Sequence, residues 1–459
     1  MHSLWAIAKN TLSQAIRMKA AAVVIVLLIV LLPLMSVVMD GDGTLLGKLQ
    51  TFVSYGLGLV SFLLCVLTIA VSAFTLSNDL KRRHLYLVLT KPVRRYEVIV
   101  GKLLGILILD VFLLALFGAI IYILTLMMPG MAKADPSERL QANAEFFTAR
   151  TGLKVSYDEA ELRKAAEQRF TQLKESNQLP QEMSQPRVLA ELIGQERMIA
   201  KSCPPGQVKR WDFDGVGLDV PDDPNAFLFV RYKFEAAAQL PDDKVYGLWR
   251  IGDLRQLEAG TERLATPIYY IERDETVRAY HEFVVPARAV ADDGFLAIAF
   301  FNNPALNPTT VILNEVEVLF HSGTFTLNYL RALLMIYIRL AFLAALGVSL
   351  TTWLSFPVAI LMSLVVFLAG TVNGFILDSF DGLGAVMGLV YNFSLRPLLW
   401  MIPQFDGAYN PSSYIINGRL IDWPFLSMMI IVTLLIKAAI VLLLGIWIFS
   451  RREIAKAVV

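Results

Sequence analysis

Few side chains in this sequence have the types and spacings that catalysis or metal binding requires. The four histidines are scattered along the chain at His2, His84, His281 and His321. A nucleotide-phosphate loop needs the pattern G-x-x-x-x-G-K-[ST]. The nearest stretch, GDGTLLGKL at residues 41–49, has its glycines one residue too close and Leu49 in the place of the hydroxyl. We therefore expect no catalytic centre, no metal site and no cofactor in this chain.

Three ionisable residues lie inside apolar runs of the sequence: Asp110, Arg339 and Lys437. A charge at the centre of a membrane helix costs about 2.5–3.5 kcal/mol on insertion scales, so each residue needs a partner or a water-filled path. Two interpretations stay open, a structural contact such as an Asp110–Lys437 pair, or the lining of a substrate path. Arg339 lies about 12 Å into its run, close enough to extend its guanidinium outward.

A short basic loop at residues 77–102 separates two of these apolar runs. It contains two acidic residues, Asp79 and Glu97, and a central proline, Pro92. Its seven basic residues are Lys81, Arg82, Arg83, Lys91, Arg94, Arg95 and Lys102. Excess positive charge in a short loop between spans indicates the cytoplasmic side. The loop could serve only to orient the helices and bind anionic lipid, or it could bind a protein partner.

The elements that would position these residues are membrane helices, because 56% of the chain is hydrophobic and its mean hydropathy is +0.56. A span needs about 20 apolar residues. We expect six spans, at about 20–39, 52–76, 103–128, 330–353, 356–377 and 425–449. Residues 4–19 predict an amphipathic helix on the membrane surface. Short apolar pieces within 378–424 indicate re-entrant or interfacial half-helices, and both termini are expected in the cytoplasm.

The chain between the third and fourth spans has a different character. Residues 131–325 carry a net charge of −8, whereas the rest of the chain carries +9. Residues 129–205 are rich in helix-forming residues, and 206–325 contain short runs with period-2 alternation that predict a β-sandwich. The stretch GFLAIAFFNNP and its neighbours resemble a galactose-binding-type jelly roll. Residues 1–128 and 326–459 would form the membrane part around this extracytoplasmic α+β insert.

Aromatic and acidic residues of the insert allow two interpretations each. Trp211, Trp249 and the pair Tyr269-Tyr270 could line a sugar-binding face, but they suit a buried sandwich core better. Three acidic doublets could bind Ca²⁺ between strands, but they suit solvated turns better. These doublets are Asp222-Asp223, Asp242-Asp243 and Asp292-Asp293.

The basic loop resembles the corresponding segment of ABC-2-type transporter permeases. In that family a short coupling helix is followed by L-T-K-P-V-x-R-x-E and then by Gly-Lys-x-x-Gly at the start of the next span. The matching residues here are Leu89, Thr90, Lys91, Pro92, Val93, Arg95, Glu97, Gly101, Lys102 and Gly105. The Gly-Thr that often precedes the coupling helix is replaced by Lys81-Arg82-Arg83-His84. The amphipathic start, LSFPVAIL and the final Arg-Arg-Glu extend the resemblance over most of 1–128 and 326–459.

The resemblance implies a permease subunit that pairs with a second permease, identical or different, and with separate ATPase subunits that bind the ATP. A docking helix over Asp79 to Leu89 would contact the ATPase. The implied contact residues are Asp79, Lys81, Arg82, Arg83, His84, Leu85, Pro92, Arg95 and Glu97. The expected location is the bacterial inner membrane, with residues 129–325 outside the cytoplasm.

The function implied is transport, and the large outer insert favours export and a periplasmic partner; no nucleic-acid partner is expected. Two alternatives stay open at this point. One is a polytopic envelope receptor or anchor whose outer sandwich binds glycan and whose basic loop binds only lipid. The other is an ABC-driven mechanotransmitter that moves the outer domain without transport. The fold expected in each case is a polytopic α-helical membrane protein with an inserted β-sandwich or jelly roll.

Overall fold

The computed structural model describes residues 2–81, 94–132, 134–176, 185–217, 226–238, 240, 242–258, 265–380 and 385–451. The chain forms two compact units. Unit 1 joins Met1–Ala149 to Thr324–Val459, and unit 2 is Arg150–Gly323. Each unit has its own apolar core, so each is described by itself.

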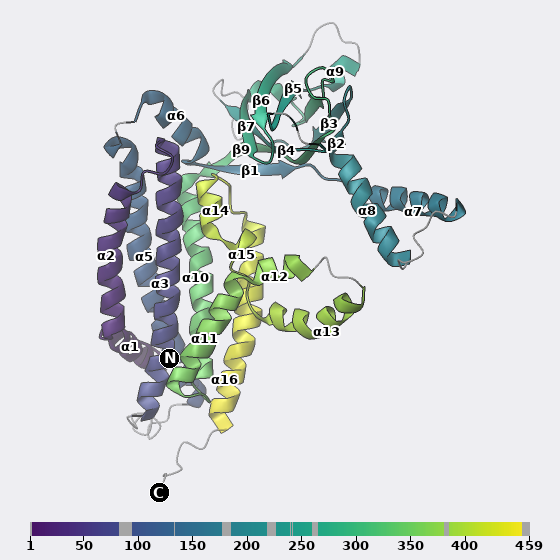
Figure 1. The fold of residues 1–459 in the computed structure, drawn as a ribbon. Coiled ribbons are helices and arrows are strands. Elements are labelled where there is room, and N and C mark those ends of the chain that lie inside the picture. Colours follow the sequence, from purple (N-terminus) through teal and green to yellow (C-terminus); the bar gives the residue numbers. More distant parts are fainter. Residues whose placement is uncertain are drawn as a thin grey trace. The chain divides into compact units, whose positions relative to one another are not determined.

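Unit 1 is mainly helical, and it also contains the first residues of β1 and the last residue of β9 (Figure 1). Its N-terminal helices are α1 (His2–Ile16), α2 (Lys19–Val38), α3 (Leu45–Lys81), α5 (Arg95–Met131) and α6 (Pro136–Glu145). Its C-terminal helices are α10 (Phe325–Leu350), α11 (Phe356–Thr371), α12 (Asn373–Phe380), α13 (Ala385–Met401), α14 (Pro411–Ile416), α15 (Trp423–Met429) and α16 (Ala439–Arg451). A π-helical stretch, Ile430–Ala438, joins α15 to α16.

Five stretches of the described chain are long and apolar enough to cross a membrane. They are α2, α3, α5, α10 and the continuous run Trp423–Arg451. The predicted fifth span is shorter than expected, because α11 ends at Thr371 after 16 residues and α12 begins at Asn373. Helices α13 and α14 lie within the segment 378–424, for which half-helices are predicted, and α12 ends at its start.

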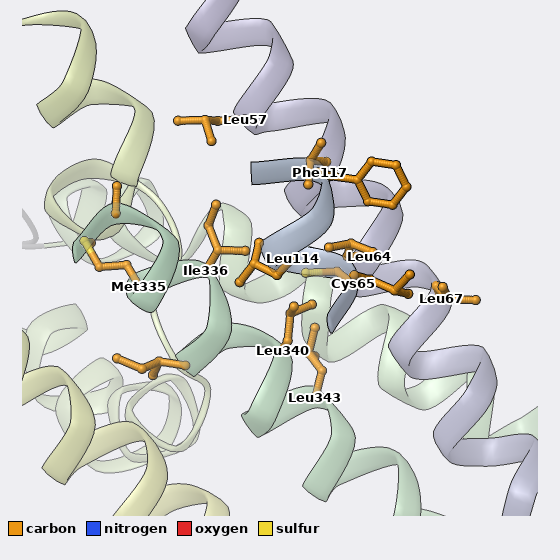
Figure 2. Close-up of a cluster of buried hydrophobic side chains, with 14 of the residues drawn as sticks. Leu57, Leu64, Cys65, Leu67, Leu114, Phe117, Met335, Ile336, Leu340 and Leu343 are labelled. Carbon is orange, nitrogen blue, oxygen red and sulfur yellow. The ribbon is translucent and has the colours of Figure 1, made fainter. Parts of the chain in front are cut away.

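The core of unit 1 lies where α3, α5 and α10 meet (Figure 2). Leu64 of α3, Phe117 of α5 and Ile336 of α10 are all fully buried there. In a bilayer, lipid tails are as apolar as leucine, so close packing rather than water exclusion stabilises such a contact. α10 is buried along most of its length, whereas α2 keeps most of its apolar side chains exposed.

Unit 2 contains two antiparallel sheets. In the first, the order is β1-β9-β4-β7, with β2 also paired to β9; in the second it is β3-β8-β5-β6. The strands are β1 (Thr148–Lys154), β2 (Ser202–Cys203), β3 (Val208–Phe213), β4 (Phe227–Ala236), β5 (Lys244–Gly252), β6 (Tyr269–Thr276), β7 (Tyr280–Pro286), β8 (Leu296–Phe301) and β9 (Val311–Thr324). Helices α7 (Glu159–Glu175) and α8 (Gln185–Lys201) and the short α9 (Arg255–Glu258) complete it.

The two sheets enclose one aromatic core. The period-2 alternation of β4 places Tyr232 and Phe234 inside, both fully buried, beside Trp249 of β5 in the other sheet. The ring centroids of Tyr232 and Trp249 are 4.5 Å apart, and those of Trp249 and Phe300 are 5.1 Å apart. The prediction of a polytopic helical protein with an inserted β domain is confirmed; the jelly-roll topology stays a prediction.

One detail differs from the sequence analysis. Residues Thr148–Lys154, within a segment predicted to be helical, form β1, because their backbone pairs with the long strand β9. Helix α6 lies within the predicted helical segment 129–205, and in the structure it groups with unit 1, where Ala142 joins the apolar core.

The central position of Trp249 predicts that it carries much of the stability of unit 2. Trp249→Ala should reduce the free energy of unfolding by about 3–5 kcal/mol, because it leaves a large cavity among aromatic rings. Trp249→Phe should cost much less, since the indole Nε1 has no hydrogen-bond partner among the described residues. Pulse proteolysis of the intact chain across a urea series measures both.

Tyr270→Ala is the matched control, because this aromatic ring is 67% exposed. It should change the free energy of unfolding by no more than about 0.5 kcal/mol. A loss for Trp249→Ala as small as that of the control would contradict the assigned core.

Candidate functional site

The predicted partner-binding loop is described only at its two ends. Arg82, Arg83, His84, Leu85 and Pro92 lie outside the described residues, and so does most of the predicted docking helix. Asp79 and Lys81 end α3, and Arg95 and Glu97 begin α5. The contacts of Asp79, Arg95 and Glu97 show how the two ends of the loop are held.

A buried ion pair joins the two ends. Lys102 Nζ lies 2.5 Å from Asp79 Oδ2 and donates a second hydrogen bond, 3.0 Å long, to the carbonyl oxygen of Thr75. The Lys102 side chain is 2% exposed and that of Asp79 is 12% exposed. Removing one member of such a pair leaves an uncompensated buried charge, which is strongly destabilising. The pair therefore fixes the end of α3 against the first turns of α5.

The amphipathic helix α1 packs against the ends of α3 and α5 that this ion pair joins. A Cβ atom at Gly105 would lie 2.6 Å from the carbonyl oxygen of Ala8, and one at Gly101 would lie 2.9 Å from Ile7 Cβ. Only glycine allows the α1 backbone to approach α5 this closely. Gln14 Nε2 makes a long hydrogen bond of 3.5 Å to Asp79 Oδ1. We call this meeting point of α1, the end of α3 and the start of α5 the helix base.

Arg95 and Glu97 add further contacts to the helix base. The Glu97 carboxylate accepts hydrogen bonds from the backbone N–H of Arg94, at 3.3 Å, and from Ser3 Oγ, at 3.1 Å. An acidic group is favourable at a helix N-terminus. Arg95 donates to the carbonyl oxygen of Ser450, at 2.8 Å, near the end of α16. Four helices are thus fastened at the two ends of the loop.

The charges inside the apolar helices have separate partners. Asp110 Oδ1 accepts a hydrogen bond of 2.8 Å from Thr68 Oγ1, whereas Lys437 Nζ donates to the carbonyl oxygen of Ile402 at 3.2 Å. The structure therefore does not pair Asp110 with Lys437. Asp110 Oδ2 is buried without a hydrogen-bond partner among the described residues.

Arg339 does not extend outward as the sequence allowed, because it is only 8% exposed. It donates to Ser61 Oγ at 3.1 Å and to the carbonyl oxygen of Phe405 at 2.9 Å, and its guanidinium lies 4.8 Å from the Phe405 ring centre. Backbone carbonyls accept from a buried guanidinium without a second charge. Arg339 thus fastens the segment before α14 to α10 and α3.

Of the residues singled out in the insert, Asp222 and Asp223 lie outside the described residues, and several of the others have structural contacts. Trp211 and Trp249 are buried, whereas Tyr270 is exposed beside Arg250. In the doublet at residues 292–293, Asp293 is paired with Arg255 at 2.8 Å, and hydrogen bonds from Arg255 lower the pKa of both Asp293 and Asp253. No group of three potential metal ligands occurs among the residues that the structure describes.

The pairing partner of Asp79 is a residue that the sequence analysis did not identify. Lys102 was counted only as part of the basic loop and the Gly-Lys-x-x-Gly motif. The sequence did contain a sign of this pair: Asp79 and Lys102 have opposite charges, are 23 residues apart, and lie at the facing ends of two apolar helices. The helix base can carry a displacement of the loop into several helices together.

The ion pair predicts strongly non-additive mutational effects. Asp79→Leu and Lys102→Met should each reduce the free energy of unfolding by about 3–5 kcal/mol, because each leaves one buried charge unpaired. The double variant should lie close to the wild type, since two apolar side chains replace two charges. Unfolding in mixed detergent micelles measures all three. Additive losses would contradict the pair.

The exposed pair Asp40–Lys48 provides the matched control for these single and double variants. Lys48→Met should change the free energy of unfolding by less than about 1 kcal/mol, because solvent screens an exposed pair.

The close contact of α1 predicts that Gly105 tolerates no side chain. Gly105→Ala should displace α1 and increase cleavage by trypsin after the exposed Lys9 and Arg17. Gly58→Ala is the control, because nothing lies within 4 Å of a Cβ atom there. That variant should be neutral or more stable by up to about 1 kcal/mol, the helix preference for alanine over glycine. Equal cleavage of the two variants would refute the contact.

Comparison with known proteins supports the resemblance seen in the loop. Residues 5–150 match the family model described as ABC-2 family transporter protein. No curated protein and no solved structure matches the chain. The matched region contains most of α1 and all of α2, α3 and α5, and hence most of the helix base. Through residues 5–150 the chain is therefore similar to the ABC-2 family of transporter proteins, and this match supports a multi-pass membrane permease of an ABC transporter.

Proposed function

We propose that this permease is an exporter subunit that receives mechanical work from a separate ABC ATPase through residues 77–102. ATP is bound and hydrolysed in that partner, and this chain supplies no catalytic group. Two permease copies, identical or different, would flank the transport path. The membrane is a bacterial inner membrane, with residues 129–325 on its outer side and in reach of a periplasmic partner.

The observation that carries the proposal is the helix base. Asp79 precedes the loop and Lys102 follows it, and their buried pair leaves little freedom for the two ends to move apart. Packed helices move as rigid bodies and deform little, because protein interiors are packed as densely as organic crystals. A force on the loop would therefore move α3, α5 and α1 together.

The direction of transport is inferred from the insert and the loop charges. The basic loop indicates the cytoplasmic side, so the net-negative insert after the next span would lie outside. A large folded domain on the outer side suits the release of a substrate outward or its transfer to a periplasmic protein.

The coupling role predicts a selective defect. Replacing His84 and Leu85 together by alanine should abolish co-purification with the ATPase and reduce coupled ATPase activity at least about tenfold, equivalent to 1.4 kcal/mol of coupling. The helix base should remain folded, because neither residue belongs to it. Arg17→Ala, which neutralises an exposed charge directly after α1, is the control and should keep both properties.

Unchanged ATPase binding and coupled activity in the His84/Leu85 variant would refute the coupling role. Substrate flux in proteoliposomes then separates export from mechanical transmission. ATP-dependent flux is expected; intact coupling without flux would support the mechanotransmitter instead.

A further inference from the structure

A cavity of about 170 Å³ lies within unit 1, away from the helix base. It is bounded by α12, the end of α13, the segment that follows, and the run from α15 into the π-helical stretch. Its polar and aromatic lining consists of Asn373, Trp400, Gln404, Tyr409, Thr433 and Lys437. Apolar side chains of α12, α13 and α15 complete the wall.

Lys437 brings a positive charge to this cavity, and no carboxylate of the described residues pairs with it. Its Nζ donates one hydrogen bond to the carbonyl oxygen of Ile402 and lies 5.4 Å from the centre of the Trp400 ring. Among the described residues it forms no ion pair. An ammonium group has three donors, so two remain for a ligand. Because an unpaired charge among apolar helices is costly, the site favours an anion.

An unusual backbone conformation positions Lys437. It belongs to the nine-residue π-helical stretch Ile430–Ala438, which also contributes Thr433 to the cavity. Such stretches are rare and are frequent at functional sites. The local widening interrupts an otherwise regular apolar run, so the sequence alone did not indicate that Thr433 and Lys437 share a cavity.

Asn373, which also lines the cavity, has a side-chain oxygen that can accept a hydrogen bond. It is 2% exposed, and its Nδ2 donates to the carbonyl oxygens of Leu399, at 3.2 Å, and Ile402, at 3.1 Å. Its Oδ1 is buried with no hydrogen-bond partner among the described residues. A buried acceptor without a donor costs free energy, and a hydroxyl or amine of a ligand would satisfy it.

We propose that this cavity binds the phosphate or carboxylate group of an amphiphile, with Lys437 as its ionic contact. The surroundings favour an amphiphile over a small soluble anion, because Trp400 and Met428, which line the cavity, are 55% and 47% exposed. These apolar surfaces would contact the hydrocarbon part. The proposal goes beyond the coupling function and requires only that unit 1 lies in a bilayer.

Native mass spectrometry of the intact chain in detergent tests the site. Phosphatidylglycerol should be retained in preference to phosphatidylcholine. Lys437→Met should weaken phosphatidylglycerol retention about tenfold, equivalent to 1.4 kcal/mol, whereas Lys437→Arg should stay close to the wild type. Lys48→Met, which removes a lysine from outside the cavity, should retain phosphatidylglycerol as the wild type does.

Competition by inorganic phosphate identifies the source of the anion. Retention that a millimolar excess of phosphate does not reduce supports a lipid headgroup; displacement by phosphate supports a soluble anion at the same lysine. Equal retention of the two lipids, or equal phosphatidylglycerol retention by Lys437→Met and wild type, overturns the proposal. Thermal unfolding confirms that each variant is folded, and Lys437→Gln replaces Lys437→Met if that variant is not.

Discussion

The buried ion pair between Asp79 and Lys102 is the interaction on which the rest of the helix base depends. Each charge lies at the end of an apolar helix, and neither is stable there alone. Pairing them sets the register of α3 against α5. That register brings Gly101 and Gly105 to the surface on which α1 lies, and both ends of the basic loop are then held within one packed body.

Two other charged residues of unit 1 illustrate two ways of placing a cation among apolar helices. Arg339 donates to Ser61 and to the carbonyl oxygens of Phe405 and Tyr409, and so stabilises the segment before α14. Lys437 has a single carbonyl partner and lies at a cavity. Unit 2 is stabilised differently, by aromatic rings around Trp249 between its two sheets.

Local patterns allowed much of this architecture to be predicted. The apolar runs located the long helices, the alternation in β4 identified its buried face, and the loop motif indicated the family whose model residues 5–150 match. What could not be predicted depends on contacts between distant segments. Strand β1 forms because β9 offers it a partner, and the Asp79–Lys102 pair exists because two helices meet at one depth.

The central claim is that α1 and α5 move as one body when the loop is displaced. Spin labels at Lys9→Cys and Tyr96→Cys, on exposed positions, test it by pulsed electron resonance, since the native Cys65 and Cys203 are buried. The account predicts one narrow distance distribution, identical in the resting complex and in the complex trapped with a non-hydrolysable ATP analogue. A broad distribution, or a shift between the two states, would contradict it.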